Sequence, residues 1–100
     1  MDIEQAKREL EAAERDLQRC ANEVERTGRE WLKAERASRA NGRMHHRLRG
    51  QYGDNYRQRL QNDRESAKKA FDEARARRDK AKAVYDKAAA ANDAGASDQG

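Results

Sequence analysis

Apolar side chains recur along the N-terminal part of the chain with a period of seven residues. The large members of this pattern are Ile3, Leu10, Leu17, Val24 and Trp31. Three residues after each of them comes a smaller side chain, in the order Ala6, Ala13, Cys20, Thr27 and Ala34. This spacing is the a/d heptad of a coiled coil, in which small residues let a facing helix approach closely. We therefore predict a helix over residues 2–40, capped by Asp2 with Gln5 as capping-box partner.

A second heptad pattern fills the C-terminal part of the chain. Its central ladder consists of Leu60, Ala67, Ala74, Ala81 and Ala88. Apolar residues flank the ladder at plus three (Ala70, Val84 and Ala91) and at plus four (Phe71 and Tyr85). The pattern predicts a helix over residues 55–92 with a stripe wider than a two-stranded seam needs, so that it can contact two helices. The small polar residues 93–100 are expected to form a flexible tail.

The segment between the two patterns, residues 41–54, is expected to reverse the chain. It holds three of the six glycines, and each glycine inside a continuous helix costs about 1 kcal/mol relative to alanine. The predicted fold is therefore all-α: an antiparallel two-helix coiled-coil hairpin over residues 1–92. One continuous helix in a long parallel dimer is the alternative.

An antiparallel register follows from the position of the turn. Residues whose numbers add to about 96 should lie opposite each other, which places Asp16 beside Lys80 and brings Arg64 close to Trp31. One such hairpin buries little apolar surface, because its seams are largely alanine. We therefore expect two copies to associate into a four-helix bundle.

The composition narrows the class of protein. Of the 100 residues, 42% are charged, 35% are hydrophobic and none is proline, as in coiled coils and long helices. The chain has no apolar run long enough to span a membrane and no recognisable signal peptide, so we expect a cytoplasmic protein without membrane contact. Its one cysteine, Cys20, excludes an intrachain disulfide framework and is expected to be a small buried hydrophobe.

Positive charge gathers where the two helices are expected to be joined. Residues 36–64, which we call the Arg-rich turn end, hold eight basic and two acidic side chains, and all eight basic ones are arginine. Arginine with interleaved aromatic residues can bind carboxylates or phosphates bidentately and stack on bases. The candidate partner-binding residues are Trp31, Arg36, Arg39, Arg43, Arg47, Arg49, Tyr52, Tyr56, Arg57 and Arg59.

The sequence offers no catalytic constellation, phosphate-binding loop or metal-ligand spacing, and His45 and His46 point apart on a helix or turn. We expect neither an enzyme nor a cofactor. The leading hypothesis is a small regulator or inhibitor, of the bacterial or phage type, that binds a larger protein with an acidic surface. The same end could instead bind nucleic acid, or the chain could be a purely structural oligomerisation module.

Overall fold

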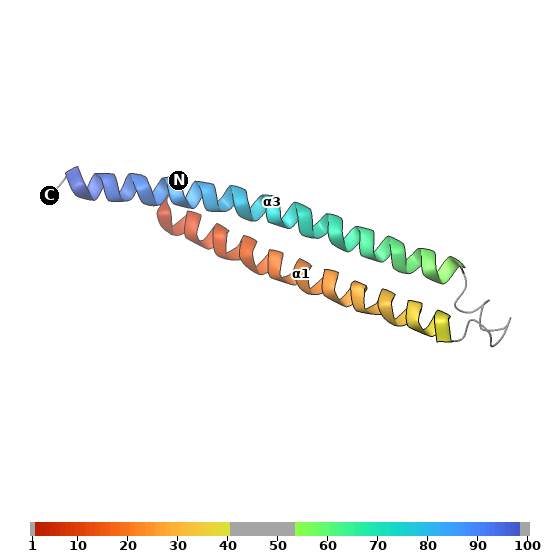
Figure 1. Cartoon of the computed structure of the whole chain (residues 1–100). Coiled ribbons are helices and arrows are strands. Elements are labelled where there is room, and N and C mark those ends of the chain that lie inside the picture. The colour runs from red at the N-terminus through yellow and green to blue at the C-terminus, as the bar shows by residue number, and fades with distance from the viewer. Residues whose placement is uncertain (1, 41–53, 99–100) are drawn as a thin grey trace. The chain divides into compact units, whose positions relative to one another are not determined.

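The computed structural model describes residues 2–40 and 54–98, with side chains described over 2–37 and 56–93. Two helices make up this part of the chain: α1 spans Ile3–Ala40 and α3 spans Asp54–Asp98 (Figure 1). The helix α3 continues six residues beyond the predicted end at residue 92. The residues there include alanines and a single glycine but no proline, so nothing forces the helix to stop.

The start of α1 is capped as expected by Asp2. The backbone N–H of Glu4 donates to Asp2 Oδ1 at 3.4 Å, and the N–H of Ala6 donates to the Asp2 carbonyl at 3.0 Å. The predicted capping-box role of Gln5 is wrong, because its side-chain amide donates to Glu9 one turn further along the helix. Asp2 therefore accepts from two N–H groups at this helix end, one through its side chain and one through its carbonyl.

The two helices divide into two compact units. The central unit is Cys20–Phe71, and the terminal unit combines Met1–Arg19 with Asp72–Gly100. In each unit a segment of α1 lies beside a segment of α3, and the residue colours run in opposite directions along the two segments (Figure 1). In the described residues, the expected all-helical fold with two helices packed against each other is confirmed.

The contact between the helices follows the small-residue ladders. The buried hydrophobic residues in the described part of the chain are Ala6, Leu60, Ala67 and Ala74, and the buried polar residue is Thr27. The large residues Ile3, Leu10, Leu17 and Trp31 are only half-buried, and Val24 is 36% exposed. The predicted seams are therefore used, but of their large side chains in the described residues only Leu60 is buried.

The two flanks of the α3 ladder have different environments. Phe71 and Tyr85, at plus four, are half-buried, whereas Ala70, Val84 and Ala91, at plus three, are exposed. The stripe that meets α1 is therefore formed by the ladder together with its plus-four flank. The apolar residues of the plus-three flank are exposed in this single chain.

Candidate interaction surface

The predicted partner-binding residues fall partly inside the described structure. Arg36, Arg57 and Arg59 are exposed, while Trp31 and Tyr56 are half-buried. Arg39 lies in the last turn of α1, but its side chain is outside the described residues. The predicted residues that lie wholly outside them are Arg43, Arg47, Arg49 and Tyr52.

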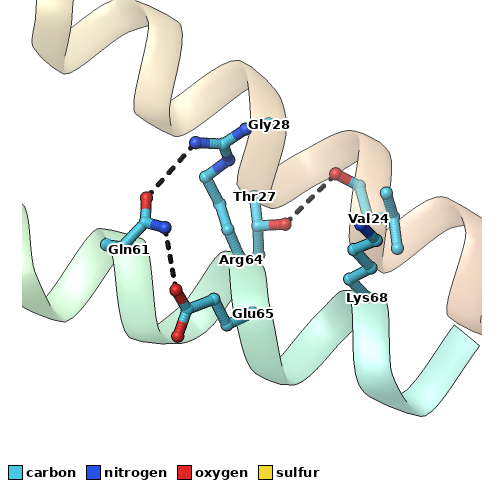
Figure 2. Close-up of a pocket in the computed structure, with 7 residues that line it drawn as sticks. All are labelled: Val24, Thr27, Gly28, Gln61, Arg64, Glu65 and Lys68. Carbon is cyan, nitrogen blue, oxygen red and sulfur yellow. Dashed lines mark hydrogen bonds between the residues drawn. The ribbon is translucent and has the colours of Figure 1, made fainter.

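Trp31 and Arg64 meet in the central unit as the antiparallel register predicts. The guanidinium carbon of Arg64 lies 5.0 Å from the centroid of the Trp31 ring, which is cation–π geometry. Arg64 Nη1 also donates to Gln61 Oε1 at 3.4 Å, and Gln61 Nε2 donates to Glu65 Oε1 at 2.9 Å (Figure 2). This chain of contacts fixes the Arg64 side chain across the space between α3 and α1.

Leu32 is the most exposed large hydrophobic residue in the described part of the chain, at 53%. It lies outside the heptad seam and one helical turn before Arg36, so an apolar side chain and a guanidinium are close on the same flank of α1. The sequence left open whether Leu32 is covered. Its exposure adds an apolar contact to the surface that the arginines define.

A groove between the helices opens beside Trp31 and Arg64. It has a volume of about 380 Å³ and is lined by Val24, Thr27 and Gly28 from α1 and by Gln61, Arg64, Glu65 and Lys68 from α3 (Figure 2). Thr27 is 3% exposed, and its hydroxyl donates to the carbonyls of Glu23 at 3.0 Å and Val24 at 3.1 Å. The buried hydroxyl is therefore satisfied within its own helix.

Gly28 is a residue of this groove that the sequence analysis overlooked. It lies in the interior of α1, where glycine costs about 1 kcal/mol relative to alanine. A Cβ atom built at Gly28 would meet nothing within 4 Å, so the packing of α1 on α3 does not require glycine there. The available signal was a lone glycine in an otherwise regular heptad pattern.

The two edges of the helix pair in the central unit differ in charge. In each helix, the residue that follows a small seam residue lies about 100° from it around the helix axis. The residue three positions after the same seam residue lies about 60° from it in the opposite direction. Gly28, Gln61 and Lys68 of the first set line the groove, and we call this side the groove edge. The second set, counted from the small seam residues of α1 and from the α3 ladder, comprises Glu23, Glu30, Ala37, Asp63 and Ala70, and we call this side the acidic edge.

Intrahelical ion pairs order the acidic edge. Arg26 binds Glu23 and also Glu30, the latter at 2.8 Å. The hydrogen bond with Arg26 is the main cause that holds the pKa of Glu23 below its ordinary value, and the same bond raises the pKa of Arg26. These side chains are largely exposed, so the pairs contribute only modestly to stability.

One ion pair joins α1 to α3 within the terminal unit. Arg77 Nη2 donates to Asp16 Oδ2 at 2.8 Å, and Arg19 also binds the Asp16 carboxylate. The hydrogen bond from Arg77 is the largest cause that lowers the pKa of Asp16, followed by that from Arg19. The predicted pairing of Asp16 with Lys80 is therefore wrong, because the partner is Arg77, about one helical turn earlier in α3. Asp16 follows the seam residue Ala13 by three positions and Arg77 follows Ala74 by three, so the two side chains lie on the same side of the helix pair.

The described residues contain neither a candidate metal centre nor a candidate membrane span. No group of three or more His, Cys, Asp or Glu side chains there could hold a metal ion. No helix there is long and apolar enough to cross a membrane. The chain matches no protein-family model, no curated protein and no solved structure, so function has to be inferred from the surface itself.

Proposed function

We propose that the chain is a non-enzymatic protein–protein interaction module, a small regulator or inhibitor of a larger partner. It binds an acidic surface of that partner through its Arg-rich turn end. The observation that supports this most is the exposure of Leu32 one turn from the exposed Arg36. Interfaces combine apolar anchors with arginine, and a guanidinium can bind a carboxylate through two hydrogen bonds.

Arg57 and Arg59 are exposed near the start of the described α3 side chains and extend the positive surface within the same unit. Arginine pairs with carboxylates chiefly to steer association and fix orientation. Leu32 and the exposed part of Trp31 supply the apolar contact that slows dissociation.

Nucleic-acid binding by the same arginines is the second candidate function. The environment of Trp31 favours a protein partner instead, because Arg64 already lies over the ring and competes with a base for that position. The two functions also differ in salt dependence. Binding to phosphates falls steeply with salt concentration because counterions are released, whereas an interface with apolar anchors falls less.

We also propose that two copies associate into a four-helix bundle. The buried hydrophobic residues described are three alanines and Leu60, and no large side chain there is fully buried. Full burial of a leucine contributes only about 1.5–3 kcal/mol. So little apolar burial contributes little stability, and association of two copies would add to it. A purely structural oligomerisation module would share this assembly but lack the partner.

Affinity capture with matched arginine variants tests the partner. The native chain is immobilised and exposed to a lysate of its source with and without nuclease, and captured proteins are identified by mass spectrometry. The test variant replaces three exposed arginines of the Arg-rich turn end by alanine: Arg36, Arg57 and Arg59. The control variant makes the same change in charge at exposed arginines of the terminal unit: Arg8, Arg15 and Arg75.

The expected result is one discrete protein that survives nuclease, binds the control variant and is lost with the test variant. Its capture should also weaken when Leu32 is replaced by serine, which changes no charge. Capture that disappears with nuclease supports nucleic-acid binding instead. Equal capture by both arginine variants contradicts a site at the Arg-rich turn end.

A further inference from the structure

The groove edge of the central unit carries a row of residues on α1 that are spaced four apart. Residues at this spacing form one ridge of a helix surface. The members of the row are Val24, Gly28, Leu32 and Arg36. Val24 is 36% exposed, Leu32 is 53% exposed and Arg36 is exposed as well. The row therefore runs from an apolar side chain in the groove to a guanidinium of the Arg-rich turn end.

Gly28 leaves open space within this row. A Cβ atom built there would meet nothing within 4 Å, and the Arg64 side chain reaches from α3 toward α1 beside it (Figure 2). When two helices pack, a position without a side chain lets the second backbone approach closely. The packing of α1 on α3 does not use this space, so a helix from outside the chain fits it.

Two cations lie at the two ends of the apolar part of this surface. Lys68 lines the groove together with Val24, and Arg36 follows Leu32 by one turn. Among the residues that the structure describes, neither Lys68 nor Arg36 makes an ion pair or a hydrogen bond through its side chain. Both cations are therefore available to bind carboxylates from outside the chain.

Two carboxylates beside the row already have partners within their own helix. Glu25 binds Arg29 at 3.5 Å, and Glu65 accepts a hydrogen bond from Gln61 at 2.9 Å. The unpaired charge at the ends of the row is therefore positive, and an acidic segment complements it. The row covers about 18 Å at ~1.5 Å per residue, so the carboxylates of a helical segment must stand about three turns apart.

The backbone of the described chain favours a helix as that segment. An extended peptide binds by adding a strand to an exposed sheet edge, and the described part of the chain is helical, with its backbone groups bonded within each helix. An amphipathic helix instead lays its apolar face against exposed apolar side chains. Val24 and Leu32 supply such side chains on either side of Gly28.

We propose that the docking element of the partner is an acidic amphipathic α-helix that lies over Gly28 along the groove edge. Its apolar side chains contact Val24 and Leu32, and its carboxylates bind Lys68 and Arg36. This inference rests on the proposed partner binding and names the element of the partner that the chain receives.

Matched substitutions in the full chain test the position of this helix. Lys68→Glu reverses a charge in the groove, whereas Lys69→Glu makes the same change at the next residue of α3, which is exposed and does not line the groove. Gly28→Leu fills the open space, and Ala70→Leu is its control on the acidic edge of the same unit. Circular dichroism confirms that each variant is helical. Affinity for the purified partner, identified by the capture experiment, is measured by titration calorimetry.

Lys68→Glu and Gly28→Leu are each expected to weaken binding on the order of tenfold or more, while both controls bind like the native chain. Hydrogen exchange of the complex should protect a segment of the partner that has helical apolar spacing and carboxylates about three turns apart. A protected segment without this pattern overturns the proposal. So does protection of the Val24–Leu32 row in the chain by itself at raised concentration, because a second copy then covers it.

The outcomes separate this inference from the proposed function. Binding that is lost with the arginine variant but is equal for Lys68→Glu and Lys69→Glu overturns the helix on the groove edge and leaves the Arg-rich turn end as the binding site. Equal capture by the two arginine variants overturns both proposals.

Discussion

Replacing Ala74 by leucine tests whether the alanine ladder spaces the helices. Ala74 is 1% exposed, and leucine adds three carbon atoms at that point. If the helices are in close contact, these atoms overpack the seam and cost about 1–3 kcal/mol. If the seam has room, burying them stabilises the fold by up to about 2.4 kcal/mol at ~0.8 kcal/mol each. The two accounts therefore predict opposite signs.

Ala76→Leu is the matched control, since Ala76 lies two residues further along α3 and is exposed. Its effect should stay within about 0.5 kcal/mol. The assay is thermal and urea unfolding followed by circular dichroism at one fixed protein concentration, because association changes apparent stability. A loss of about 2 kcal/mol lowers Tm by roughly 8–16 °C in a chain of this size. A leucine at position 74 that leaves Tm unchanged or raises it refutes close packing along the ladder.

Three further predictions concern single side chains. Gly28→Ala should stabilise the monomeric chain by about 0.5–1 kcal/mol in urea unfolding, because the added methyl group meets open space; a loss would contradict this. Arg64→Ala should change the fluorescence of Trp31, the only tryptophan, and cost about 0.5–1 kcal/mol, whereas an unchanged emission spectrum would contradict the stacking. The pKa of Asp16 is lower in the folded chain than in the unfolded chain, so its pairing with Arg77 stabilises the fold at pH values above the pKa of the unfolded chain. This stabilisation is lost as the pH falls through the pKa of the folded chain. The Tm difference between native and Asp16→Asn chains should therefore be present at pH 7 and vanish in acid; a pH-independent difference would argue against the pair.

The candidate surface was only partly predictable. The cluster of arginines was evident from composition along the chain, and Arg64 near Trp31 followed from antiparallel pairing. Gly28 was missed because a glycine in a helix is ordinarily a defect, and only the empty space around it shows that the internal packing does not need it. Whether Leu32 is covered depends on which side of α1 faces α3, and a position outside the seam does not settle that.

The sequence by itself determined that the chain forms long helices and that their small-residue ladders face each other. The heptad spacing of Ala6, Thr27, Ala67 and Ala74 was enough for this, because side chains that repeat with the helical period lie on one side of a helix and are buried together. Tertiary structure alone decided the details that depend on side-chain reach. It paired Asp16 with Arg77 instead of Lys80, since a register inferred from turn position does not specify which flank residues meet. It also placed Gly28 of α1 and Lys68 of α3 along one groove, because a groove between helices exists only once the two helices lie side by side.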